Sequence, residues 1–344
     1  MLARVLADPA ESGTLDVEGW TSLIAVARAE QLAGTLAHRV LGLPMPEAAA
    51  AILAEARAAA EHSRRAALWE AEMARRALAP LACPVVLLKG TAYVAAGLAA
   101  GQGRSIGDLD ILVPREALDA VEAALLAHGW EWVKPDPYDD AYYRRWMHEL
   151  PPLIHRERDR MIDVHHTILP LTAGPKPDAA AMISSSVALG NGQRVLSLAD
   201  MIVHSSAHLF ADGDLTGGLR NLWDIHCLLL DVDEHGFKAA VELRERAWEH
   251  DLVAAVARAL RLAHTVYGTP VDHVLAGKPQ VSDRLLLRRL FARDDWGRGT
   301  RPLTRFGFYV RGHVLRMPPP MLARHLWTKF RLQRRSSVDT SSSK

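Results

Sequence analysis

Cysteine is scarce in this sequence of 344 residues, which contains only Cys83 and Cys227. The two are far apart and form no CxxC pair, which argues against a disulfide framework and against a cysteine-based zinc site. No apolar run reaches the roughly 18 residues that a membrane-spanning helix needs, and the N-terminus does not resemble a secretory signal. These absences predict a cytoplasmic protein with buried free thiols and no membrane span.

A strong excess of charge of one sign is also missing, since the formal net charge is +1. The whole chain therefore shows no strong preference for nucleic acid or membrane. One segment differs, because residues 296–338 contain no acidic residue, and arginines and aromatic side chains recur there. We favour a packed helix with a solvated basic face for residues 298–335. An anionic partner stays open, bound by stacking on nucleic acid bases or by an amphipathic helix.

Composition divides the chain into four parts. Residues 1–80 are rich in alanine, leucine, glutamate and arginine, and they predict helices, including a long one that begins after Pro46. Residues 81–170 mix strand and helix patterns, and residues 171–335 return to helical patterns. The serine-rich end, residues 336–344, predicts a disordered tail. We expect an α+β protein with an α/β core between an N-terminal and a C-terminal helical region.

The central part contains short apolar segments that are rich in β-branched or aromatic residues and bounded by glycine, proline or charged residues. Such segments predict strands at 85–88, 109–113 and 130–133, and a hairpin at 153–155 and 161–165. Helices are expected between the strands, at 91–100 and 115–128, with a loop or short helix at 134–148.

Asp108 and Asp110 are the first candidates for chemistry. Successive side chains of a strand point to opposite faces, so these two carboxylates point the same way. Carboxylates this close repel each other unless a cation neutralises both. Mg²⁺ takes oxygen ligands of this kind together with substrate phosphates. An Asp-x-Asp pair by itself is more often a solvated turn than a metal site, so the prediction depends on what accompanies it.

A third carboxylate, Asp163, lies in the apolar strand predicted at 161–165. An unpaired charge there would be costly, and a second metal ion usually needs a third carboxylate. The alternative is a structural ion pair with Arg158 or Arg160. His165 falls on the same face of the strand as Asp163. The sequence therefore predicts Asp108, Asp110 and Asp163 as metal ligands and catalytic residues.

Phosphate-binding groups precede the aspartate pair. Lys89, Gly90 and Thr91 follow a buried strand and open a predicted helix. Glycine lets a phosphate approach the backbone closely, and a helix N-terminus offers free N–H groups. Lys89 and Arg104 would add positive charge against a triphosphate. We assign Lys89, Gly90, Thr91, Arg104 and His165 to nucleotide binding.

These motifs together resemble the uncharacterised nucleotidyltransferase family, a branch of the polymerase-β-like nucleotidyltransferase superfamily. The resemblance is carried by 87–90, Arg104, 108–113 and 162–165, and it covers roughly residues 83–170. It implies a small mixed sheet with helices on one side. The wider superfamily usually has Gly-Ser where this chain has Gly90-Thr91, and its gap to the first aspartate is shorter; the longer gap is typical of this branch.

The resemblance also implies an activity. A nucleoside monophosphate, by default AMP from ATP, would pass from an NTP to a hydroxyl or other acceptor, and pyrophosphate would leave. Two Mg²⁺ ions are implied, with Mn²⁺ as an alternative. Asp108 and Asp110 would hold both ions, and Asp163 would hold the catalytic one and help to deprotonate the acceptor. The acceptor stays open among small molecules, peptides, proteins and RNA.

Two other functions remain open. The same fold could bind a nucleotide or a peptide without turnover. A metal-dependent hydrolase could instead use His204, His208, Asp224 and His226. His204 and His208 are four residues apart, which places them on one helix face. We favour satisfied or pocket-lining polar residues for this group, and Arg220 and Asp224 have the spacing of a helical ion pair.

Overall fold

The N-terminal region is helical, in a computed structural model that describes residues 1–211 and 213–316. Its helices are α1 (Leu2–Ala7), α2 (Val17–Ala29), α3 (Ala33–Arg39) and α4 (Glu47–Leu78). The long helix predicted after Pro46 is thus confirmed. The predicted tail at 336–344 and residues 317–335 of the basic segment lie outside the described residues.

A mixed sheet of seven strands forms the core and confirms the α+β fold class. Its strands are β1 (Val86–Leu87), β2 (Asp108–Leu112), β3 (Trp130–Trp132), β4 (Leu153–His155), β5 (Met161–His165), β6 (Val187–Ala188) and β7 (Arg194–Val195). Their order is β3-β4-β5-β2-β1-β7-β6. β2 pairs with β5 in parallel and with β1 antiparallel, and β4 and β5 form the predicted antiparallel pair.

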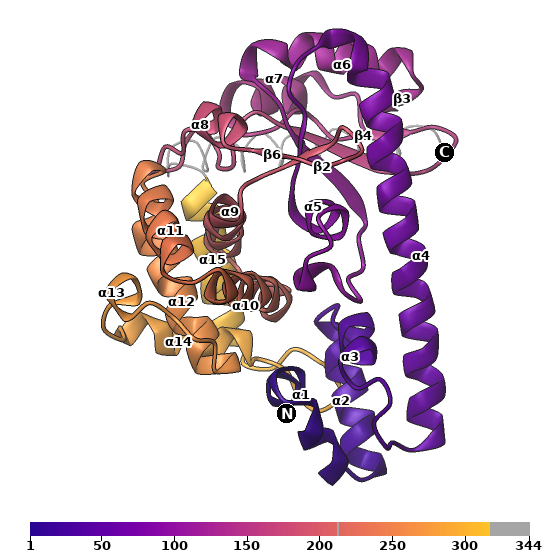
Figure 1. Cartoon of the computed structure of the whole chain (residues 1–344), viewed down its shortest axis with the longest axis vertical. Coiled ribbons are helices and arrows are strands. Elements are labelled where there is room, and N and C mark those ends of the chain that lie inside the picture. The colour runs from indigo at the N-terminus through magenta and orange to yellow at the C-terminus, as the bar shows by residue number, and fades with distance from the viewer. Residues whose placement is uncertain (212, 317–344) are drawn as a thin grey trace, which may run out of the picture.

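The two faces of β2 have different roles, as its alternating sequence predicts. Leu109 and Ile111 are buried, and Ile111 lies beside Ala71 and Ala74 of α4. Figure 1 shows α4 running along one side of the molecule from the sheet to α2 and α3. The opposite face of β2 carries Asp108 and Asp110.

Helices of the central region connect the strands. They are α5 (Lys89–Ala95), α6 (Leu118–Ala127), α7 (Pro137–Trp146) and α8 (Ala179–Ser184). The first begins two residues earlier than predicted, because Lys89 adopts a left-handed conformation that turns the chain out of the strand, and it ends at Ala95. Asp136 caps α7 by accepting hydrogen bonds from Tyr138 N and Asp139 N. The segment predicted as a loop or short helix at 134–148 is therefore mainly a helix.

The sheet extends beyond residue 170, into the part of the chain that was expected to be helical. β6 and β7 form a small antiparallel pair, and β7 joins β1 in parallel. Each of these strands has only two residues. Segments this short contain no measurable periodicity, which is why the sequence pattern did not reveal them.

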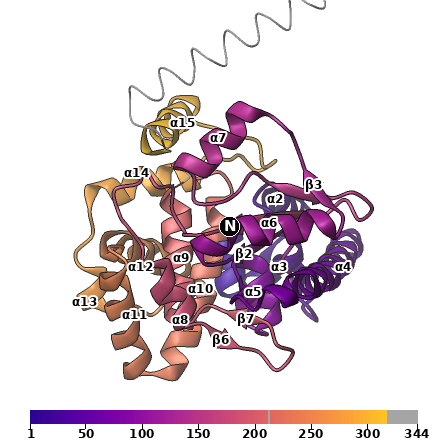
Figure 2. The same ribbon diagram turned by 90° about the horizontal axis from the view of Figure 1, so that it is seen from above.

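Helices make up the described chain after β7. They are α9 (Leu198–Ala211), α10 (Gly218–His235), α11 (Phe237–Glu249), α12 (Val253–Tyr267), α13 (His273–Ala276), α14 (Val281–Leu290) and α15 (Pro302–Arg316). The Tyr93 hydroxyl and the Ser205 hydroxyl, 2.6 Å apart, join α5 to α9. Figure 2 shows the central strand β2 between α9–α10 on one side and α3–α4 on the other.

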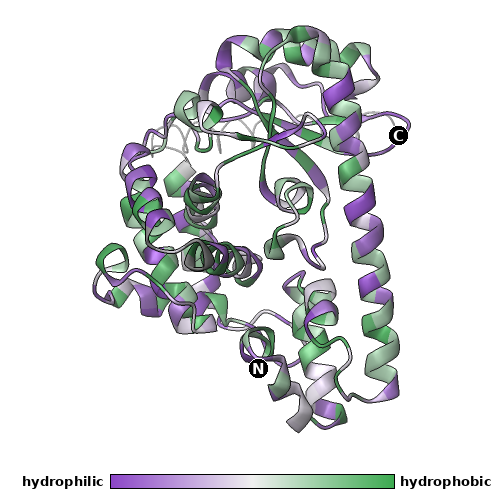
Figure 3. Ribbon diagram, in the orientation of Figure 1, coloured by the Kyte–Doolittle hydropathy of each residue, from purple (hydrophilic) through white to green (hydrophobic). Residues whose placement is uncertain are grey.

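Hydrophobic residues gather where these layers meet, and Figure 3 shows them in the central strands and in α9. Alternating hydrophilic and hydrophobic stretches follow the exposed helix α4. Both cysteines are free thiols, and Cys227 is buried while Cys83 is partly exposed. Within residues 1–211 and 213–316, no helix has the length and apolar character needed to cross a membrane.

Candidate active site

Three carboxylates meet on the sheet because of the register between β2 and β5. Asp110 and Asp163 are direct partners in this parallel pair, so their side chains leave the same face side by side. Asp108 lies two residues before Asp110 and shares that face. One carboxylate oxygen of each residue lies within 4.8 Å of the others. This set of oxygen donors suits a hard divalent cation.

Asp110 is the buried centre of the group, with an exposure of 3 %. Its Oδ1 atom lies 2.6 Å from Lys89 Nζ and 2.9 Å from His165 Nε2. Burial by itself would raise the pKa of Asp110, but the Lys89 ammonium and His165 outweigh it and hold this pKa below its usual value. Burial likewise opposes the charge on Lys89, and Asp110 outweighs it and raises the lysine pKa. Both groups are therefore charged at neutral pH.

The pKa of Asp163 is shifted in the direction opposite to that of Asp110. Burial, together with the nearby carboxylates of Asp110 and Glu149, raises its pKa to about 7. The structural ion pair considered for this residue is not formed with Arg158, because Arg158 binds Glu70 of α4 at 2.7 and 3.0 Å. The negative charge of the three aspartates therefore exceeds the single positive charge that Lys89 supplies.

The turn between β1 and α5 positions Lys89. Its φ of 47° is uncommon for a residue with a side chain, and such strain is typical of functional sites. The next residue is Gly90, where an added Cβ would collide with the guanidinium group of Arg104 and lie 3.2 Å from Ile106 Cγ1. Glycine is therefore required for the close approach of Arg104 to this turn.

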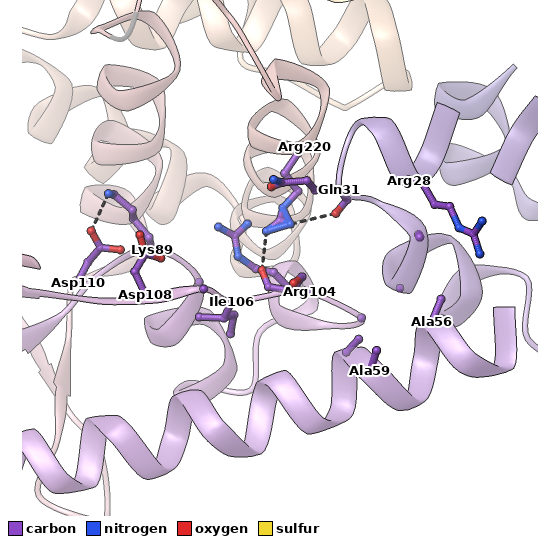
Figure 4. Close-up of a pocket in the computed structure, with 17 residues that line it drawn as sticks. Arg28, Gln31, Ala56, Ala59, Lys89, Arg104, Ile106, Asp108, Asp110 and Arg220 are labelled. Atoms are coloured by element: carbon purple, nitrogen blue, oxygen red, sulfur yellow. Dashed lines mark hydrogen bonds and ion pairs between the residues drawn. The ribbon is translucent and has the colours of Figure 1, made fainter. Parts of the chain in front are cut away.

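A pocket of about 570 Å³ opens beside Asp108 and Asp110. Figure 4 shows it between the aspartates, helix α4 and the N-terminal helices. Arg104 on its wall forms an ion pair with Asp224 of α10. Arg220 lies 3.8 Å from the same carboxylate, and it donates to the backbone oxygens of Gln31 and Ser105 at 3.3 and 3.2 Å.

Positive charge is in surplus on this wall, because two guanidinium groups share one carboxylate. Burial and the neighbouring Arg104 lower the pKa of Arg220 to about 10, which still leaves it charged at neutral pH. The Nε atoms of Arg104 and Arg220 are buried and have no hydrogen-bond partner within the described chain. Buried donors of this kind are normally satisfied. Both arginines line the pocket, so their positive charge would favour an anionic ligand there.

Most of the predicted residues come together here. Lys89, Gly90, Arg104, Asp108 and Asp110 line the pocket, and Asp163 and His165 adjoin them on the sheet. Thr91 is the exception. It is 1 % exposed and is not part of the pocket lining, and its Oγ1 atom has no hydrogen-bond partner among the described residues. A role for Thr91 in nucleotide binding remains a prediction.

Charged and amide side chains that the sequence pattern did not assign also reach this site. Arg28 and Gln31 come from the end of α2 and the turn after it, Arg220 comes from α10, and all three line the pocket. Glu149 precedes β4 and lies close enough to Asp163 to raise its pKa. None belongs to a motif near the aspartates, so only the tertiary contacts could identify them.

The histidines and the aspartate of α9 and α10 do not form a common site. Asp224 pairs with Arg104, while the ring of His226 bonds to the Thr269 hydroxyl at 2.8 Å. Candidate metal-ligand groups within the described chain include neither of these residues, nor His204 or His208. Of the two arrangements considered from the sequence, only the three aspartates converge.

A family model for uncharacterised nucleotidyltransferases matches residues 16–268. The chain belongs to this family. The matched region contains the sheet, the three aspartates, and Arg28, Gln31 and Arg220 of the pocket wall. It also extends the motif resemblance from the sheet into both helical regions. A search of curated proteins finds no match.

The family assignment supports nucleotidyl transfer as the general activity and an NTP as the substrate class. The three aspartates could bind a metal ion of the kind that nucleotidyltransferases use. Their all-oxygen donor set, on the edge of a pocket with surplus positive charge, fits a hard cation together with an anionic substrate.

Proposed function

We propose that this protein transfers a nucleoside monophosphate from an NTP, with ATP as the default donor, to an acceptor, with release of pyrophosphate. Its metal-ion cofactor would be Mg²⁺, bound by Asp108, Asp110 and Asp163, with Mn²⁺ as an alternative. One observation carries the proposal. The negative surplus at the aspartates and the positive surplus at Arg104 and Arg220 border the same pocket, and a metal–triphosphate complex balances both.

Each residue has a role that follows from its position. Asp108 and Asp110 would anchor the metal at the pocket edge, and Asp163 would complete the site from β5. Lys89 is held against Asp110 and would contact the phosphates, as would Arg104 and Arg220 on the pocket wall. Gly90 would keep the approach open. When bound, the metal would supply the positive charge that stabilises the reacting phosphate.

Asp163 would also act on the acceptor. It lies opposite Asp110 on the neighbouring strand, and a metal ion bound there would keep its carboxylate ionised and able to accept a proton. The α-phosphorus would be attacked in line by the acceptor oxygen, whose proton would pass toward Asp163. Most of the rate would come from positioning and electrostatics.

The proposal is tested by measuring NTP binding with and without Mg²⁺, for wild type, Asp108→Asn and Asp119→Asn. Asp119 lies on α6 with its side chain 98 % exposed, so it controls for an Asp→Asn change as such. We expect Mg²⁺-dependent binding in wild type and in Asp119→Asn, and its loss in Asp108→Asn. Labelled NTPs incubated with protein, Mg²⁺ and a lysate would then reveal the acceptor.

Two results would refute this proposal. One is an absence of Mg²⁺-dependent affinity for any of the four common ribonucleoside triphosphates. The other is unchanged binding in Asp108→Asn. Binding of Mg²⁺-NTP without label transfer to any acceptor would instead favour a non-catalytic nucleotide-binding module.

A further inference from the structure

Beside the three aspartates, a second set of ligand-type side chains converges. It consists of His148, Glu149 and His165, whose ligand atoms all lie within 4.8 Å of one another. His148 and Glu149 lie between α7 and β4, and Glu149 pairs with His165 of β5 through an antiparallel β-bridge. Glu149 Oε2 is 3.5 Å from His165 Nδ1 and 3.7 Å from His148 Nε2. The nucleotidyl-transfer proposal gives none of these three a metal-binding role.

One of the two ring nitrogens of His165 lacks a hydrogen-bond partner in the described chain. Its Nε2 atom donates to Asp110 Oδ1, which accepts this bond as part of an ionised carboxylate. Nδ1 of a neutral ring then carries a lone pair, and it faces a carboxylate of Glu149 that also only accepts. His165 is 1 % exposed, and its buried Nδ1 atom has no hydrogen-bond partner in the described chain. Two facing acceptors need a cation or a proton between them.

The distances favour a metal ion over a proton. A charge-assisted hydrogen bond would bring nitrogen and oxygen to about 2.7–2.9 Å, and both separations from Glu149 are longer. Two ligands on a tetrahedral zinc ion, with bonds of 2.0–2.1 Å, lie about 3.3 Å apart. The observed 3.5 and 3.7 Å are within a few tenths of an ångström of that separation.

We propose that His148, Glu149 and His165 form a site for a divalent transition metal of the Zn²⁺ type, distinct from the carboxylate site for Mg²⁺. Imidazole nitrogen suits zinc and related metals, whereas Mg²⁺ prefers oxygen. Asp110 would orient the ring by accepting from its other nitrogen, an arrangement that is common around zinc-bound histidines. The ion would tie the segment before β4 to β5 and hold His165 against Asp110.

Cobalt(II) is the probe, because tetrahedral Co²⁺ with nitrogen ligands absorbs visible light whereas Mg²⁺ does not. The full-length protein is treated with a chelator, dialysed and titrated with Co²⁺, then with Zn²⁺. We expect one Co²⁺ per chain with visible bands, displaced by one equivalent of Zn²⁺. Glu149→Gln and His148→Ala should each weaken binding at least about tenfold.

Two control variants locate the ion. His128 is exposed at the end of α6, so His128→Ala should leave the titration unchanged. Asp108→Asn removes a carboxylate from the Mg²⁺ site alone and should also keep the visible bands. Circular dichroism checks the fold of each variant, and the near-isosteric Glu149→Gln decides the matter if His148→Ala does not fold.

The proposal is overturned if wild type takes up no stoichiometric Co²⁺, or if Glu149→Gln binds it as tightly as wild type. It is also overturned if Asp108→Asn loses the bands as completely as Glu149→Gln, since the ion would then lie at the aspartates. The outcome is independent of nucleotidyl transfer. Zinc-type binding can be absent while Mg²⁺-NTP binding is present, and the reverse.

Discussion

The aspartates of β2 and β5 and the arginines of the pocket wall are two groups of charged side chains of opposite sign. Among Asp108, Asp110 and Asp163, the protein supplies one close ammonium group, from Lys89 to Asp110. On the wall, Arg104 and Arg220 share the carboxylate of Asp224. Each group keeps a surplus of charge of one sign, and unpaired charge that is shielded from water is costly. The comparison teaches that two groups with uncompensated charge of opposite sign, around one pocket, indicate a ligand that carries both positive and negative charge.

The largest expected effect comes from breaking the negative group at its centre. Asp110→Asn removes a metal ligand and also the partner of Lys89 and His165. We expect nucleotidyl transfer to fall on the order of 10³-fold, measured as label transfer from NTP to the acceptor found in lysate. Asp119→Asn should retain wild-type activity. Activity within tenfold of wild type in Asp110→Asn would contradict the assignment of the site.

Breaking the positive group should affect stability more than catalysis. Asp224→Asn leaves two buried guanidinium groups without their shared carboxylate, and breaking a buried ion pair from one side costs about 3 kcal/mol of unfolding free energy. Chemical denaturation measures this. Affinity for Mg²⁺-NTP should be maintained at a temperature where the variant is folded, because the positive surplus increases. A stability equal to that of wild type would show that Asp224 does not balance these arginines.

His226 of α10 is a buried side chain whose ring already has a hydrogen-bond partner in the protein, the Thr269 hydroxyl. We expect it to make the stability of the protein depend on pH. Burial, followed by the charge of Arg39, lowers its pKa from 6.5 to about 4. Between these values the unfolded chain binds a proton that the folded chain does not. The contribution to stability should therefore be almost complete above pH 6.5 and fall by about 3 kcal/mol as the pH approaches 4.

His226→Gln tests this expectation, because glutamine can still bond to Thr269 but does not titrate in that range. The variant should show a smaller loss of unfolding free energy between pH 6.5 and 4 than wild type does. The same loss in both proteins would mean that other groups cause the acid sensitivity. This measurement concerns α10 and is independent of any bound ligand.

The smallest expected effect has the opposite sign. At pH 8 and with a chelator present, Asp163 is ionised beside Asp110 and Glu149, since its pKa is about 7. Asp163→Asn removes this repulsion and should stabilise the metal-free protein by about 1 kcal/mol. Mg²⁺ should raise the melting temperature of wild type and not of the variant. Destabilisation of the metal-free variant would mean that Asp163 has a cationic partner within the protein.

The sequence predicted those parts of the site that lie close together in the chain. Lys89 and Gly90 come directly after one strand, and Asp108 and Asp110 are alternate residues of the next. Local backbone geometry was therefore enough to predict that each pair belongs together. The β6–β7 pair was missed because two-residue strands leave no pattern. The start of α5 was placed too late, because a left-handed lysine is not visible in propensities.

Residues brought in by packing were beyond such reasoning. Arg28 and Gln31 reach the pocket because α2 and α3 pack against α4 and the loop before β2, where the backbones of Gly34 and Gly103 lie close together. Glu149 is brought close to Asp163 and His165 only by the antiparallel β-bridge between Glu149 and His165. Conversely, His226 and Asp224 are two residues apart in sequence but bond to unrelated partners.

The sequence by itself determined which side chains leave the same face of a strand, because that depends on a period of two residues. It therefore specified Asp108 and Asp110 as a pair and His165 as a companion of Asp163. Only the tertiary structure decided that β5 lies beside β2 with Asp163 opposite Asp110. It also decided that two arginines share one carboxylate across the pocket. Register and packing are set by contacts between distant segments, and no local pattern encodes them.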